Sequence, residues 1–188
     1  MNEIDINREK CVKLLNKYVT NQNLIKHMLA VEAAMKCYAK KFHENETYWG
    51  NVGLLHDFDY EKYPEPKDHP YKGVEILKKE RYSDEFTEAI LAHSAHTGIS
   101  LDTALKKTIF AVDELCGFIV AVALVKPHKI LSEVEIKSIK KKLKDKAFAK
   151  TVKRVEIYKG AEILGQTIDE HIGNVLAGMK NIANDLGL

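Results

Sequence analysis

His56 and Asp57 stand next to each other at the end of the apolar run YWGNVGLLHD. In such surroundings an imidazole and an ionised carboxylate are costly to bury unless they are paired or bound to a cation. A metal ion meets both demands, because imidazole nitrogen and carboxylate oxygen are common ligands of transition metals. The pair therefore marks the centre of a predicted metal site.

Two further residues combine ligand chemistry with apolar surroundings. His27 falls on the apolar face of a predicted helix over residues 23–41. Asp113 lies in the apolar stretch of residues 109–125, on the side that is apolar, whereas Glu114 fits the helix surface better. This mixed nitrogen and oxygen set suits manganese, iron, cobalt, nickel or zinc, and it consists of His27, His56, Asp57 and Asp113.

The order of these residues resembles the H…HD…D signature of the HD superfamily of metal-dependent phosphohydrolases. The resemblance covers residues 20–125 and implies an all-α, single-domain fold of about eight to ten helices around the metal site. The series HD, DHPYKG and ILAH resembles the HDIG-type branch, in which additional histidines bind a second ion. By that resemblance His69 and His93 are the candidates for the second site.

One position departs from the HDIG-type pattern. This chain reads HDFDYEK where the branch usually reads HDIGK, so the lysine that follows the HD pair is absent from its place. The sequence leaves open whether Lys62 substitutes for it. Beyond residue 125 the chain resembles a subgroup of HD hydrolases with a lysine-rich C-terminal helical region.

The resemblance implies an enzyme that hydrolyses phosphate esters, either a phosphomonoesterase or a phosphodiesterase. Its cofactor would be one or two divalent transition metal ions, and its substrate a small phosphorylated molecule, with nucleotides as one candidate class. Asp57 would be the catalytic residue that bridges two ions, and a water molecule activated there would attack phosphorus. Two alternatives stay open: a di-iron oxygenase of the same superfamily, and a noncatalytic nucleotide-sensing domain.

Three nearby residues have roles that the sequence does not decide. Asp59 and Glu61 are candidates for proton transfer, although acids in loops are more often only solvated. His96 follows His93 by three residues and shares its face only if the helix continues, and the following TGIS suggests that it ends. His96 is therefore an open ligand assignment.

Helices are predicted to position these residues, since the chain shows neither strand alternation nor an internal repeat. Three prolines within seven residues end the helix of His56 in an ordered loop. Asn7 and Ser83 are predicted caps, and Ser132 with Glu135 a predicted capping box. The predicted helices cover residues 8–19, 23–41, 48–57, 70–80, a segment from 83 through His93, 101–125, a segment with 136, 139, 143 and 147 on one face, and 168–185.

The length of the chain favours one domain over residues 1–188, with a core at 20–125 and a helical extension at 126–188. The longest apolar stretch contains two acids and is too short to span a membrane. A net charge of +2 does not indicate a nucleic-acid partner, and the lysines of residues 136–154 are interpreted as the solvated face of a packed helix.

The remaining predictions concern location and single residues. The N-terminal segment MNEIDINREK lacks the apolar core of a secretion signal, so a cytoplasmic location is expected. The thiols are expected to be reduced and packed, because no two form a CxxC pair; they are Cys11, Cys37 and Cys116. Three histidines outside the predicted site are expected to be solvated, namely His43, His128 and His171.

Overall fold

The computed structural model describes residues 6–188, and within them the chain forms ten α-helices, two short 3-10 helices and no strand. This confirms the all-α prediction. Residues 1–5, which begin the segment assessed for a secretion signal, lie outside the described residues. The helices are α1 (Arg8–Tyr18), α2 (Gln22–Phe42), α3 (Glu46–Leu55), α4 (Tyr71–Lys79), α5 (Asp84–Ala92), η1 (Ala95–Thr97), α6 (Ala104–Leu124), η2 (Leu131–Glu133), α7 (Ile136–Lys144), α8 (Arg154–Ile163), α9 (Ile168–Lys180) and α10 (Ala183–Leu186).

Side-chain caps start several of these helices. The Asn7 side chain accepts a hydrogen bond from the backbone N–H of Lys10 at 3.1 Å, and Ser83 Oγ accepts one from Phe86 at 3.2 Å. Both caps are as predicted, because a short polar side chain satisfies a backbone donor that the first turn leaves free. Asn21 caps α2 in the same way and so fixes where the helix that carries His27 begins.

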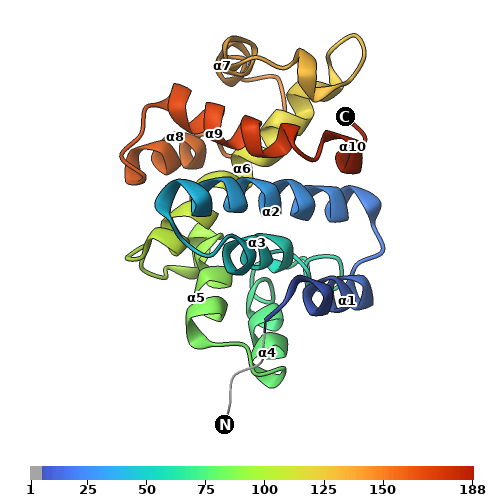
Figure 1. Cartoon of the computed structure of the whole chain (residues 1–188), viewed down its shortest axis with the longest axis vertical. Helices are drawn as coiled ribbons and strands as arrows, with labels where there is room; N and C mark the ends of the chain where they lie inside the picture. The colour runs from blue at the N-terminus through green and yellow to red at the C-terminus, as the bar shows by residue number, and fades with distance from the viewer. Residues whose placement is uncertain (1–5) are drawn as a thin grey trace.

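Helix α2 lies at the middle of the molecule (Figure 1). It packs against α3 on one side and against α9 on the other, and α6 crosses it. Gly53 allows the approach of α3, because a Cβ atom there would lie only 2.9 Å from the backbone of Val31 and Glu32. The close packing of α2 and α3 brings His56, at the end of α3, next to α2.

Helix α6 buries most of the apolar stretch predicted for it. Ile109, Val112, Cys116 and Ile119 are fully buried within the chain's own core. None of the helices in residues 6–188 combines the length and the apolarity needed to cross a bilayer. Among the described residues all the cysteines are free thiols, as expected, and Cys11 and Cys116 are buried.

The predictions for the C-terminal part are wrong in four places. The capping box pairs Glu135 with Ser138, because Ser132 lies in η2 and not at the start of α7. Helix α7 ends at Lys144, so Ala147 is exposed in a turn and not part of the helix face. Helix α8 was not predicted, and the last predicted helix is divided into α9 and α10.

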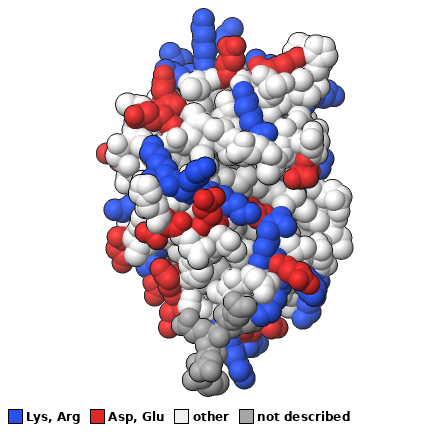
Figure 2. Space-filling view, viewed as in Figure 1, with Lys and Arg blue, Asp and Glu red and all other residues white. Residues whose placement is uncertain are grey.

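Arg154 explains why the lysine-rich segment is interrupted. Its guanidinium, at the start of α8, donates hydrogen bonds to backbone carbonyls in and after the end of α7, and so ties the turns between the two helices to α8. Ile139 and Leu143 are buried while the lysines of α7 face outward, and lysine side chains project from the end of the molecule where α7 lies (Figure 2). The carbonyls that accept from Arg154 are those of Leu143, Asp145, Phe148, Ala149 and Val152.

His171 is a further correction, since it is fully buried and not solvated. Its Nε2–H donates to the carbonyl of Ala111 at 3.0 Å, and the Tyr38 hydroxyl lies 2.7 Å from its Nδ1. Burial lowers the pKa of His171 to about 4, so the ring is neutral at pH 7. This histidine joins α9 to α2 and α6 as a core residue.

Candidate metal centre

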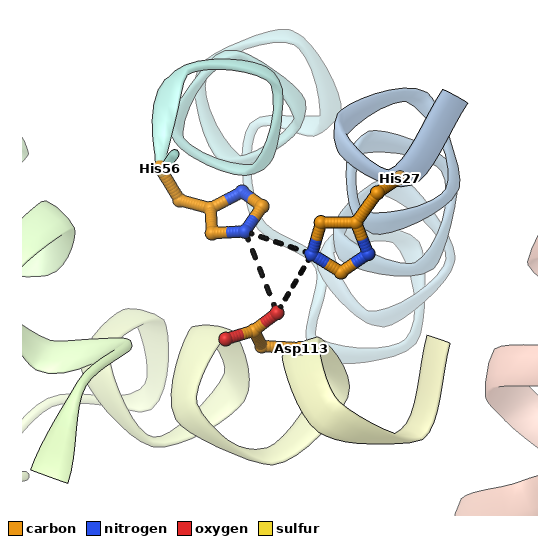
Figure 3. Close-up of side chains that lie close together, drawn as sticks. All are labelled: His27, His56 and Asp113. Carbon is orange, nitrogen blue, oxygen red and sulfur yellow. Dashed lines mark hydrogen bonds and ion pairs between the residues drawn. The ribbon is translucent and has the colours of Figure 1, made fainter. Parts of the chain in front are cut away.

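Three helices place the first group of donors, His27, His56 and Asp113, around one point (Figure 3). His27 comes from the second turn of α2, His56 from the end of α3 and Asp113 from the middle of α6. His27 Nε2 lies 3.0 Å from Asp113 Oδ1, and His56 Nε2 lies 3.2 Å from His27 Nε2 and 3.4 Å from Asp113 Oδ1. All three side chains thus present one donor atom to a shared space.

A second group consists of Asp57, His69 and His93. His69 stands at the end of the proline-containing loop and His93 at the end of α5, and both are almost fully buried. Their Nε2 atoms are 3.1 Å apart and lie 3.2 and 3.4 Å from Asp57 Oδ1. The structure therefore brings all the predicted ligand residues into two adjacent groups.

Asp57 connects the two groups. Its Oδ1 faces His69 and His93, whereas its Oδ2 lies 3.5 Å from His56 Nε2 and 3.8 Å from His27 Nε2. A carboxylate that offers one oxygen to each of two donor groups has the geometry of a bridging ligand. The bridging of two ions by Asp57 stays a prediction.

The buried histidines are held in one orientation by their second nitrogen. His56 Nδ1–H donates to the carbonyl of Gly53 at 2.7 Å, and His93 Nδ1–H donates to the carbonyl of Ile90 at 2.5 Å. Each bond leaves Nε2 as the nitrogen that faces the donor group and that can bind a metal ion once it is deprotonated. The backbone turns at the ends of α3 and α5 thus select the tautomer that binds metals through Nε2.

Asp59 holds His69 in the same way, which corrects the expectation that its carboxylate is solvated. It is fully buried, and its Oδ1 accepts from His69 Nδ1 at 2.8 Å while its Oδ2 accepts from the backbone N–H of Gly73 at 2.7 Å. A Cβ atom at Gly73 would lie 2.9 Å from Asp59 Cγ, so the glycine makes room for the carboxylate. Asp59 is a positioning residue and not a proton donor in the cleft.

The charges of the centre show what it requires. Burial lowers the pKa of His93 to about 4. Burial also opposes a charge on His69, but the carboxylates of Asp57 and Asp59 outweigh it and raise the pKa of His69 to about 9. The carboxylates beside His56 likewise raise its pKa well above the usual range, against the effect of burial. The pKa values of Asp57 and Asp113 are lowered, also against the effect of burial, by the neighbouring histidines. The centre therefore favours positive charge, as protons or as a cation.

The donor set fits a divalent transition metal in each group. His56 and His93 give their Nδ1–H to carbonyls, so each turns its Nε2 toward nitrogen and oxygen atoms that lie 3.1 to 3.5 Å away. Such converging donor atoms repel each other unless protons or a metal cation lie between them. Two or more imidazole and carboxylate donors per group are typical of manganese, iron, cobalt, nickel and zinc sites.

An open cleft of about 360 Å³ gives access to both groups. Among the described residues, Lys153, just before α8, is the one lysine that lines this cleft. Its Nζ lies 3.8 Å from the carboxylate of Glu114 and 3.4 Å from that of Glu156. Lys62 does not take the place of the lysine that the HDIG pattern leads one to expect, because its ammonium stacks on the ring of Tyr18, 4.4 Å from the centroid. The cation of this cleft was not identified from the sequence.

Glu114 ties this cleft to the C-terminal helices. Its carboxylate accepts a hydrogen bond from the backbone N–H of Lys153 at 3.1 Å, so this residue, which the sequence placed on the helix surface, is 20% exposed and has a partner in the C-terminal part. Burial raises the pKa of Glu114, and the neighbouring charge of Asp113 adds to that effect. Helix α8 therefore begins at the rim of the metal centre.

His96 lies in the cleft lining but outside both donor groups. Its Nε2–H donates to the backbone carbonyl of His69 at 3.1 Å, and Ser94 Oγ lies 2.7 Å from its Nδ1. Helix α5 ends at Ala92 and the 3-10 helix η1 carries His96, so it does not share the face of His93. Both of its ring nitrogens are used within the protein.

Comparisons with known proteins agree with this geometry. A protein-family model described as HD domain matches residues 24–117, which is half of the chain. The matched segment contains every residue of both donor groups, whereas Lys153 and helix α8 lie beyond it. A search of curated proteins and a search of solved structures each found no match.

Proposed function

Because the chain belongs to the HD domain family, we propose that it is a metal-dependent phosphohydrolase that cleaves a small phosphate ester by attack of water at the two donor groups. The observation that carries the proposal is the division of the Asp57 carboxylate, with one oxygen toward each group. This arrangement suits a pair of ions that act on one substrate phosphate.

Two divalent ions at the centre would supply an activated water nucleophile and neutralise the charge that develops on the phosphate. The chain's own residues prepare the site for that chemistry. Asp57 fixes the spacing of the two groups, and the carbonyls of Gly53 and Ile90 keep His56 and His93 in the tautomer that leaves Nε2 free. The helices that hold these residues are packed in the core, so the donors are preorganised.

Lys153 gives the cleft a cation that can contact phosphate oxygens. Its side chain is 60% exposed and stays near the centre through Glu114 and Glu156. A cleft of about 360 Å³ lies in the range of small-molecule sites, and we expect a small phosphorylated substrate, with nucleotides as one candidate class.

The first test compares the purified wild-type protein with the Asp57→Asn variant. We expect bound transition metal in the wild type, metal-dependent hydrolysis of p-nitrophenyl phosphate, its bis ester or a nucleotide, and a loss of kcat/KM of at least about a hundredfold in Asp57→Asn. Elemental analysis measures the bound metal. Absorbance of released p-nitrophenolate measures turnover of the two esters, and chromatography of the products measures turnover of the nucleotide. Glu65→Gln, an exposed acid in the loop that precedes His69, is the control and should match the wild type.

Other results would select the alternatives that the sequence left open. Bound iron with a colour change on oxidation and no turnover of any phosphate ester would favour a di-iron oxygenase. Intact metal with nucleotide binding but no turnover would favour a noncatalytic sensor. Equal metal content in the wild type and in Asp57→Asn would contradict the bridging role of Asp57.

A further inference from the structure

Gly117 lies in the middle of α6, where a glycine weakens the helix because it retains more backbone freedom in the unfolded chain than any other residue. Packing does not explain it. A Cβ atom at Gly117 meets no atom within 4 Å, whereas a Cβ atom at Gly53 or Gly160 would lie 2.9 or 2.7 Å from a packed neighbour. Open space therefore lies beside the helix at Gly117.

Two hollows in the surface share lining residues on this side of α6. One is the polar cleft over the metal centre, and the other is a groove of about 320 Å³ between α2, the second half of α6 and the C-terminal residues. Gly117 and His27 line both of them. The groove is more apolar than the cleft, since its lining includes Val120, Leu124, Leu186 and Leu188.

We propose that the groove binds the apolar organic group of a phosphate ester whose phosphate lies at the metal centre. The proposal rests on the proposed function, since it places the phosphate beside His27. The substrate class that follows is a phosphate ester whose organic group is apolar along its length, rather than one that carries further charges.

Two features of the groove support this occupant. The predicted metal ligand His27 lines both the groove and the cleft over the centre, so an organic group in the groove would lie next to a phosphate at the centre. Leu124 is 49% exposed in its wall, and covering apolar surface of this kind is favourable in proportion to the area that leaves water. A highly charged substrate such as a polyphosphate would find no further cation in the groove except Lys26, which lies against the turn at Gly187.

The test uses calorimetric titration of the Mn²⁺-loaded protein with methylphosphonate and hexylphosphonate, which mimic phosphate monoesters and are not hydrolysed. We expect hexylphosphonate to bind more tightly, by up to about fourfold for each methylene that the groove buries. Leu124→Ser should reduce that gain and leave methylphosphonate affinity unchanged. Val125→Ser is the matched control, because Val125 is equally apolar, 57% exposed and adjacent in sequence but outside the groove lining.

The outcomes separate this proposal from the proposed function. If neither phosphonate binds, phosphate recognition at the centre is wrong and both fall. If methylphosphonate binds but hexylphosphonate binds no more tightly, or gains equally in Leu124→Ser, the groove proposal is wrong and the hydrolase proposal stands. Equal binding of hexylphosphonate to metal-free protein would also overturn the groove proposal, because the phosphonate would not be held at the metals.

Discussion

Each buried histidine of the candidate centre gives one nitrogen to the protein and turns the other toward its donor group. For His56 and His93 the acceptor is a backbone carbonyl at a helix end, whereas for His69 it is the carboxylate of Asp59. A carboxylate makes its histidine a stronger donor than a carbonyl does, because the negative charge raises the basicity of the ring. The second group thus depends on Asp59 as well as on its ligands.

Replacing Asp59 with asparagine tests this dependence. In the wild type both carboxylate oxygens of Asp59 accept hydrogen bonds, one from His69 Nδ1–H and one from the N–H of Gly73. Asp59→Asn removes the negative charge and replaces one of these acceptors with an NH₂ group, so one of the two N–H groups loses its acceptor. We expect metal affinity in the second group to fall by about 10- to 100-fold, with the first group little changed. Competition with a fluorescent chelator measures the two affinities.

The control for that experiment is Glu61→Gln. Glu61 lies in the same loop, but its carboxylate is exposed and accepts hydrogen bonds from Thr20 and Asn21, away from both groups. The control should retain wild-type affinity for both ions. Equal loss in the two variants would show that the loop as a whole, and not the bond to His69, sets the affinity.

At the scale of the element, the helices of the centre are positioned by how closely their backbones approach. Gly53 brings α3 onto α2, and its carbonyl also orients His56. Gly117 has the opposite surroundings, with open space beside α6. The same substitution in these two helices should therefore change stability in opposite directions.

We expect Gly53→Ala to lower the free energy of unfolding by about 1–3 kcal/mol, because the new Cβ atom must push α3 away from α2. We expect Gly117→Ala to raise it by about 0.5–1 kcal/mol, because alanine is the better helix former and meets no neighbour. Urea denaturation measures both. A lower free energy of unfolding for Gly117→Ala would mean that the space beside Gly117 is not open in the folded protein.

The sequence predicted the donors better than it predicted their surroundings. His27, His56 and Asp113 were found because ligand side chains on apolar helix faces are costly without a cation, and that signal is local. Helix α8 was missed because its start depends on Arg154 binding carbonyls of a preceding turn, and Lys153 was missed with it. Such contacts join residues that no periodic pattern connects.

Asp59 and His171 were misjudged for a related reason. Both were assigned to solvent because loops and helix starts of polar composition are usually exposed, yet tertiary packing buries both side chains completely. Asp59 is satisfied by His69 and Gly73, and His171 by Ala111 and Tyr38. A buried polar side chain can be predicted only together with its partners, which here are distant in sequence or in a different element.

At the scale of the whole molecule, α2 separates two sets of helices. Helices α1, α3, α4 and α5 lie on one side with the second donor group, while α7 to α10 lie on the other (Figure 1). On that side Lys153, just before α8, supplies the cleft cation, and α10 forms one wall of the groove. Helix α6 crosses between the sets with Asp113 and Gly117. The centre therefore depends on how the two sets are held against α2, and His171 is one of the residues that hold them.

This role of His171 makes the whole fold sensitive to acid. Its pKa is lowered from an ordinary value of 6.5 to about 4 by burial, so the folded state disfavours the proton that the unfolded chain accepts. Its contribution to stability is complete above about pH 6.5 and is lost as the pH falls toward 4. Between pH 7 and pH 5 we expect the wild type to lose about 2 kcal/mol of unfolding free energy through this residue.

His171→Gln isolates that contribution, since glutamine keeps a donor for the carbonyl of Ala111 and an acceptor for Tyr38 but does not titrate. Urea denaturation at pH 7 and at pH 5, with the same metal loading in both proteins, gives the loss for each. Because the other histidines are common to both, the wild type should lose about 2 kcal/mol more than the variant. Equal losses would mean that the ring is protonated, or exposed to water, in the folded protein, and that α9 is held against α2 and α6 by other contacts.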